Sequence, residues 1–140
     1  FERDIKKLAE ELKLYPDEAT IWQIKGDILN SGGNLTLHLI GNLRHFIGAI
    51  VGQTGYIRQR DLEFSSKNIP RETLISELMD VSEMVKNVIT AVPESQWLEN
   101  FPVQKHGETV TMPFMMLHLL AHLEYHLGQV NYHRRLVGRN

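Results

Sequence analysis

The 140-residue chain contains no cysteine, which excludes disulfide bridges, thiol nucleophiles and thiolate metal ligands. It also lacks an excess of positive charge, because 15 Lys and Arg residues stand against 17 Asp and Glu residues. Such a balance does not favour nucleic acid or an anionic membrane surface as a partner. No apolar run approaches the roughly 20 residues of a membrane-spanning helix. We therefore expect a soluble, cytoplasmic protein that has neither nucleic acid nor a membrane as its partner.

The sequence does contain enough apolar material for one core. Hydrophobic residues make up 42% of the chain and charged residues 23%, which is the composition of a globular domain and not of a disordered chain. No internal repeat, low-complexity segment or linker divides it, and the length suits one domain. We therefore expect residues 1–140 to form a single domain. The chain begins with Phe1 and not with Met, which leaves its natural N-terminus open.

Four stretches show the spacing of apolar residues that is typical of amphipathic helices, and none shows the alternation of a strand. The predicted helices cover residues 2–14, 34–51, 70–92 and 113–137. Long connections are expected at residues 16–33 and 93–111, and an irregular, charged loop at residues 56–68. Residues 109–111 are expected either to form a short strand or to lead into the cap of the last helix. Thr111 is the expected N-cap of the last helix, because its hydroxyl can accept a first-turn N–H. Four amphipathic helices in one small domain predict an all-α fold, a four-helix bundle.

Histidine is the unusual component, since four of the seven histidines lie in the last predicted helix. On a helix that advances about 100° per residue, His118 and His126 lie about 40° on either side of His122. His133 and Gln129 fall within the same narrow sector. This face lies at the edge of the apolar stripe, where a side chain can face the interior and still be reached by water.

Imidazoles four residues apart on a helix are neighbours and can bind one metal ion. The predicted helix over 34–51 offers further ligands, His38 and His45, which share a face beside its apolar stripe. Gly41 and Ala49 lie close to that face and would leave room for an ion and its ligand. Three neutral histidine nitrogens suit zinc, nickel, copper or iron(II). Because no fourth histidine is obvious, at least one coordination position would stay open, as it does in catalytic zinc sites.

Other interpretations of the histidines stay open at this point. The spacing does not select the ligands, because His45 could replace His38 and His118 could shift the pair by one turn. A histidine beside an apolar face is often a hydrogen-bonded core residue, and His133 near the end of its helix can interact with the helix dipole. The segment is not a metalloprotease helix, because Glu124 lies two residues after the first histidine and points away from the pair.

Three segments carry a resemblance to a known family. The sequence HLEYHLGQ at residues 122–129 resembles the HxxxHxGQ signature on the last helix of the DinB-like superfamily. The sequence HLIGN at residues 38–42 resembles the HxxGN segment on the second helix of an uncharacterised branch of that superfamily. The sequence RQRDLEF at residues 58–64 resembles the charged loop of the same branch. The resemblance extends from about residue 30 to residue 138.

The resemblance implies a bundle of up-down-down-up topology with a divalent-metal site of three histidines. Carried over to this chain, the metal ligands are His38, His122 and His126. Candidates for contacts with these ligands or with a substrate are Gln129, His45 and His118. Characterised members include S-transferases and an isomerase that use low-molecular-weight thiols such as bacillithiol or mycothiol. Members often form homodimers, and we expect one here.

Two functions are consistent with these expectations. The first is an enzyme that uses zinc, nickel or iron to act on a small-molecule substrate, as a thiol S-transferase or as a hydrolase. A metal ion lowers the pKa of a bound thiol or water, and the thiol would come from a low-molecular-weight cofactor. Arg44, Arg58 and Arg60 are candidates to hold an anionic group. The second is a non-catalytic metal-binding or stress-related interaction protein. A third interpretation has no metal and only hydrogen-bonded histidines.

Overall fold

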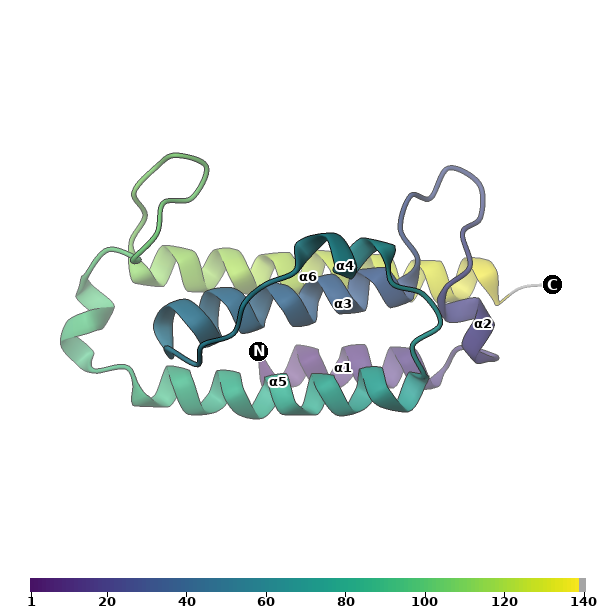
Figure 1. The fold of residues 1–140 in the computed structure, drawn as a ribbon, viewed down its shortest axis with the longest axis horizontal. Helices are drawn as coiled ribbons and strands as arrows, with labels where there is room; N and C mark the ends of the chain where they lie inside the picture. Colours follow the sequence, from purple (N-terminus) through teal and green to yellow (C-terminus); the bar gives the residue numbers. More distant parts are fainter. Residues whose placement is uncertain (139–140) are drawn as a thin grey trace.

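The computed structural model describes residues 1–138, which form helices and no strand. Figure 1 shows the long helices lying side by side along one axis. They are α1 (Glu2–Lys13), α3 (Gly32–Leu43), α5 (Arg71–Ala91) and α6 (Met112–Val137), and a π-helix, η1 (Arg44–Val51), continues α3. The all-α fold expected from the apolar periodicity is confirmed.

Each long helix packs against two others. Both α1 and α3 contact α5 and α6, so α1 and α3 lie diagonally opposite each other in the bundle. Figure 1 shows α1 and α6 running in one direction and α3 and α5 in the other. Because α3 and α5 are parallel, the chain that joins them returns along the bundle, over residues 52–70.

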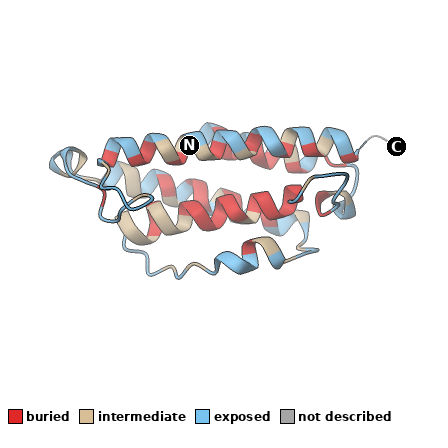
Figure 2. Cartoon of the chain, turned by 90° about the horizontal axis from the view of Figure 1, so that it is seen from above, coloured by how far each residue is buried: buried red, intermediate tan, exposed pale blue. Residues whose placement is uncertain are grey.

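The core is formed by the apolar stripes of all four long helices. Fully buried side chains from these helices include Ile5, Leu8, Leu12, Leu39, Leu43, Leu74, Leu78, Met115 and Leu119. Figure 2 shows that α3 is buried almost all round. That burial arises because a short helix, α4 (Arg60–Ser65), packs on the side of α3 that α5 and α6 leave open.

The connections contain more structure than their sequence predicts. The expectation of an irregular loop over residues 56–68 is wrong for Arg60–Ser65, which form α4. Two further short helices are α2 (Glu18–Ile21) and a 3₁₀ helix, η2 (Glu94–Leu98). Helices of four to six residues are too short to show apolar periodicity, so tertiary contacts decide whether they form. The option of a strand at 109–111 is also wrong, because Thr111 makes only an isolated β-bridge, with Asn100.

The first turn of α3 begins two residues earlier than predicted. Ser31 is its N-cap, and its hydroxyl accepts the Asn34 N–H at 3.1 Å. Gly32 and Gly33 then lie inside the helix, where a Cβ on Gly33 would lie 2.6 Å from the ring of Trp22. The glycines that suggested a loop are therefore required by close packing. Thr111 is the N-cap of α6, as predicted, and its hydroxyl accepts the Phe114 N–H at 3.3 Å.

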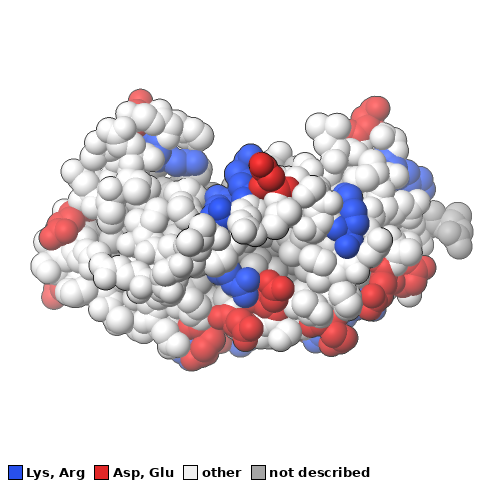
Figure 3. All heavy atoms as spheres, in the orientation of Figure 1, with Lys and Arg blue, Asp and Glu red and all other residues white. Residues whose placement is uncertain are grey.

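On the face seen in Figure 3, acidic and basic side chains are interspersed and no continuous basic patch is visible. Among the described residues, no helix combines the length and the apolar character needed to cross a membrane.

Candidate metal centre

Three histidine side chains from two helices meet midway along the bundle. Nε2 of His122 on α6 lies 3.1 Å from Nε2 of His38 on α3 and 3.2 Å from Nε2 of His126. One ligand atom from each residue lies within 4.8 Å of the others. Two nitrogens that bind one tetrahedral zinc ion at about 2.0–2.1 Å are roughly 3.3–3.4 Å apart. The separations found here are close to those of ligands to a single ion.

The hydrogen bonds on the far side of two of the rings fix where the ring protons lie. Nδ1 of His38 is 2.9 Å from a carboxylate oxygen of Glu63, and Nδ1 of His126 is 2.6 Å from Oε1 of Gln129. Both oxygens only accept, so each Nδ1 carries the proton and each Nε2 keeps its lone pair. The two lone pairs point towards Nε2 of His122.

His122 cannot satisfy both of these neighbours by hydrogen bonding. A neutral imidazole has a single N–H, so Nε2 of His122 can donate to at most one of the two lone pairs that it meets. Its Nδ1 is buried and has no hydrogen-bond partner among the described residues. A divalent cation bound by all three Nε2 atoms removes this conflict. The donor set therefore fits a metal ion.

Burial keeps these imidazoles in the neutral form that metal binding requires. For His38, burial lowers the pKa, although the neighbouring Glu63 carboxylate opposes the shift. For His126, burial again lowers the pKa. For His122, burial and the proximity of His126 and His38 lower the pKa to about 3. Near neutral pH the three imidazoles therefore do not have to release protons when they bind a cation.

Glu63 on α4 orients the His38 ring, and Arg58 holds Glu63 in place. Arg58 donates from Nε to one carboxylate oxygen at 2.7 Å and from Nη2 to the other at 2.9 Å. The two side chains are only 14% and 6% exposed. The carboxylate lies against Gly41, where a Cβ would be 2.0 Å from Oε1 of Glu63. Carboxylates that orient a metal-binding histidine typically contribute 10–100-fold to metal affinity.

Asn34 fastens α4 to α3 and so keeps Glu63 in position. Its buried amide nitrogen lies within 2.9–3.1 Å of the main-chain oxygens of Glu63, Phe64 and Ser66. These are carbonyls at the end of a helix, which need such partners. Asn34, His38 and Gly41 follow one another at four and three residues, which places them on one face of α3. That face thus supplies an anchor for α4, a histidine and a space for the carboxylate.

A family model described as the DinB superfamily matches residues 1–130. The chain belongs to the DinB superfamily. Comparisons with curated proteins and with solved structures found no match. Family membership and the three-histidine cluster are together compatible with a metal-binding site in this DinB-superfamily protein.

The other histidines of this DinB-superfamily chain lie outside the cluster. His45 is half-buried in η1, and its ring packs against Phe46. His118 is half-buried one turn before His122, and burial lowers its pKa. His133 is buried and structural: Nε2 donates to the Gln23 carbonyl at 2.8 Å, and Nδ1 lies 2.7 Å from the Tyr15 hydroxyl.

The structure corrects two interpretations of residues near the cluster. Gly41 does not leave room for an ion, because the Glu63 carboxylate fills that space. Arg58 is not a free anion-binding group, because its guanidinium pairs with Glu63. The sequence reasoning missed Glu63 and Asn34 altogether. A polar residue in the interior stripe of a helix was the only signal for Asn34, and Glu63 carried none beyond its place in the charged segment.

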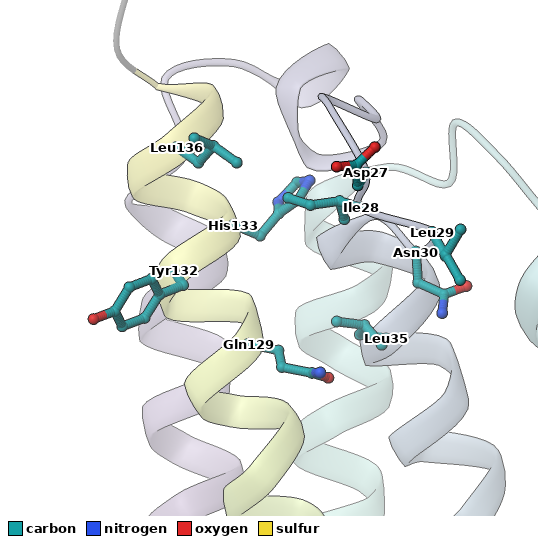
Figure 4. Close-up of a pocket in the computed structure, with 9 residues that line it drawn as sticks. All are labelled: Asp27, Ile28, Leu29, Asn30, Leu35, Gln129, Tyr132, His133 and Leu136. Atoms are coloured by element: carbon teal, nitrogen blue, oxygen red, sulfur yellow. The ribbon is translucent and has the colours of Figure 1, made fainter.

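A cavity of about 480 Å³ opens one helical turn beyond the histidines. Figure 4 shows it between the C-terminal half of α6, the start of α3 and the segment over residues 27–30. Its apolar lining residues are Ile28, Leu29, Leu35, Tyr132 and Leu136. Leu35 precedes His38 by one turn and Gln129 follows His126 by one turn, so α3 and α6 carry both the cluster and part of the cavity wall. Gln129 both contacts His126 and lines the cavity.

Proposed function

We propose that this protein is a divalent-metal-dependent enzyme that acts on a small molecule, as a thiol S-transferase or a hydrolase. The observation that carries the proposal is the convergence of three Nε2 atoms at separations that suit one ion. His38 is buried, whereas His122 and His126 are half-exposed, so the cluster has a closed side and a side that a substrate can approach. A divalent cation there supplies Lewis acidity, which lowers the pKa of a coordinated thiol or water.

The protein residues around the cluster orient groups and do not exchange protons. Both carboxylate oxygens of Glu63 are occupied by Arg58 and His38. Gln129 has no titratable group. No other carboxylate or histidine of the described residues belongs to the cluster. Because the cluster has no free general base, a reaction there requires a nucleophile that coordination activates. A cysteine-free chain must take any thiol from a low-molecular-weight partner.

The cavity next to Gln129 is suited to the organic part of the substrate. Its volume of about 480 Å³ lies within the usual range for small-molecule sites. Its lining is mainly apolar, with the polar groups of Asp27, Asn30 and Gln129 at a few points. We therefore propose a substrate with a metal-binding head and an apolar body that occupies this cavity.

Activity assays on metal-loaded protein test this function. We expect either transfer of a low-molecular-weight thiol to an alkyl or aryl electrophile, or hydrolysis of an ester or amide, with turnover that depends on added zinc, nickel or iron(II). His126→Ala should abolish the activity, and His118→Ala, a matched change one turn outside the cluster on the same helix, should retain it.

The same variants test the alternative of a non-catalytic metal-binding or stress-related interaction protein, which the lack of a free acid–base group favours. In that case metal-loaded protein would accelerate neither reaction across a broad panel. His126→Ala would still lower the metal content and the melting temperature together, because a metal that binds only the folded state stabilises it.

A further inference from the structure

The chain between η2 and α6 doubles back on itself as a hairpin over residues 99–112. Near its tip, Lys105 and Glu108 form an antiparallel bridge and exchange main-chain hydrogen bonds of 2.8 and 2.9 Å. Between them, His106 and Gly107 have φ angles of 51° and 80°, the positive values that a two-residue hairpin turn requires. The tip of this hairpin, and with it the position of Lys105, is therefore fixed by main-chain hydrogen bonds.

The base of the hairpin is anchored to the bundle. Phe101 is 3% exposed, and its ring lies 6.5 Å from the ring of Phe46 on η1. Figure 1 shows the hairpin projecting beside the first turns of α6. Figure 3 shows that the surface is hollowed between this hairpin and α4, and that basic side chains lie on both sides of the hollow.

Lys105 supplies a positive charge near the histidine face of α6. It is half-buried, whereas the residues on either side of it are exposed, so its side chain lies against the molecule. It takes part in none of the ion pairs between residues 1–138. After burial, the charge of Lys105 is the largest cause of the lowered pKa of His118. A half-buried lysine without a carboxylate partner is unusual.

Arg60 supplies a second positive charge, from α4. Its guanidinium carbon lies 5.2 Å from the centre of the Phe64 ring, and the Phe64 ring lies 5.0 Å from the ring of His38. The cation is thus held by an aromatic ring that itself lies against the cluster. Arg58 pairs with Glu63, but Arg60 forms no ion pair within residues 1–138. Its donors remain available to a ligand.

Nothing in the cluster compensates these charges once a divalent cation is bound. The three imidazoles are neutral ligands, and the negative charge of Glu63 is already matched by Arg58. No carboxylate is among the charges that shift the pKa of His118 or His122. The two charges of the cation would therefore add to those of Lys105 and Arg60, and an anionic group would bind favourably between them.

We propose that the substrate of this site carries a carboxylate in addition to its metal-binding head, and that this carboxylate binds in the hollow between Lys105 and Arg60. The inference rests on the proposed function and names the class of substrate. A guanidinium fork matches the two oxygens of a carboxylate, and an ammonium group adds further donors.

The hollow and the apolar cavity lie at opposite ends of the cluster. His118, which Lys105 approaches, precedes the metal-binding pair on α6, whereas the cavity-lining residues of α6 follow it, from Gln129 to Leu136. The substrate therefore has its carboxylate on one side of the metal-binding head and its apolar body on the other.

Hydroxamates with and without a carboxylate test this inference on the zinc-loaded protein. The probes are the monohydroxamates of succinate, glutarate and adipate, and each is compared with its terminal amide, which has nearly the same size and no charge. In calorimetry, at least one carboxylate probe should bind about fivefold more tightly than its amide, which is the effect of one ion pair at the upper end of the range for protein surfaces. Added salt should reduce this preference, because it screens the charges.

Variants of the two cations show where the carboxylate binds. Lys105→Gln should remove most of the preference and Arg60→Gln part of it, while the affinities of the amides stay unchanged. Lys105→Arg should keep the preference. Lys86→Gln is the matched control, because it removes the same charge from an exposed residue of α5, and it should also keep the preference.

The inference is overturned if every amide binds as tightly as its carboxylate probe, or if Lys86→Gln lowers the preference as much as Lys105→Gln does. In both cases zinc and the amides still bind, so the proposed function stands. Protein that binds no zinc, or whose zinc binds no hydroxamate, refutes the proposed function and this inference with it.

Discussion

Substituting Gly41 by alanine should weaken metal binding at the cluster, although Gly41 is not one of the three histidine ligands. The new Cβ would lie 2.0 Å from Oε1 of Glu63, 2.7 Å from its Cδ and 3.3 Å from its Cγ. Rotation of the carboxylate alone cannot relieve contacts with three successive atoms, so the whole side chain has to move. His38 then loses the acceptor that fixes its ring, and Arg58 loses its partner.

Two effects of measurable size follow from Gly41→Ala. Loss of a carboxylate that orients a metal-binding histidine costs 10–100-fold in metal affinity, which corresponds to about 1.4–2.7 kcal/mol. Breaking an ion pair this deeply buried costs about 3 kcal/mol. We therefore expect the variant to bind zinc more weakly and to have a lower free energy of unfolding even without metal.

Competition with a chromophoric zinc chelator measures the affinity, and urea unfolding of the metal-free protein measures the stability. Gly128→Ala is the matched control, because a Cβ there meets nothing within 4 Å, and its zinc affinity should equal that of the parent. Glu63→Gln should reproduce the loss of affinity while leaving the glycine in place. If Gly41→Ala and Glu63→Gln both bind zinc as tightly as the parent, the assigned role of Glu63 is wrong.

Three further predictions address the anchor, the buried histidine and the cavity. Asn34→Ala leaves three carbonyls without their shared donor and should lower the free energy of unfolding by about 1–3 kcal/mol in urea titrations; an unchanged value would contradict the anchoring role. Burial lowers the pKa of His133, so as the pH falls this side chain is protonated in the unfolded state before it is protonated in the folded state. The free energy of unfolding of the metal-free protein should therefore have its full value above about pH 6.5 and fall as the pH drops below it. The fall should be shallower in His133→Gln. Calorimetry of the zinc-loaded protein with hydroxamates from acetohydroxamate to octanohydroxamate should show affinity rising about fourfold per methylene. Leu29→Glu at the cavity should flatten that series, and Ile57→Glu, a change at a similarly exposed residue, should not. A series that is flat in the parent excludes the cavity as the apolar subsite.

The sequence predicted the four long helices better than the segments that connect them. The four long helices were evident because each buries an apolar stripe, and Thr111 was recognisable as an N-cap because capping is local. Burial of α3 on nearly all sides could not be predicted, since it depends on α4, a helix too short to have a periodic signal. The change from α-helix to π-helix after Leu43 had no sequence signal that we recognised.

For the histidines too, the sequence predicted contacts within one helix better than contacts between separate elements. Helical spacing predicted that His122 and His126 are neighbours on α6, but it could not decide between His38 and His45 in the predicted helix over residues 34–51. The family resemblance supplied that choice, and the structure does bring His38 to the pair on α6. Glu63 acts on a histidine that lies 25 residues earlier in the chain, and helical periodicity does not register contacts between separate elements.

The metal content of the purified protein tests the central claim most directly. Elemental analysis should be made on protein purified without a nickel column, beside His38→Ala, His126→Ala and the control His118→Ala. The account predicts close to one divalent metal ion per chain in the parent and in His118→Ala, and little or none in the other two variants. A metal-free parent that also fails to bind added zinc, nickel and iron(II) would contradict it, and the three histidines would then be only part of the packing between α3 and α6.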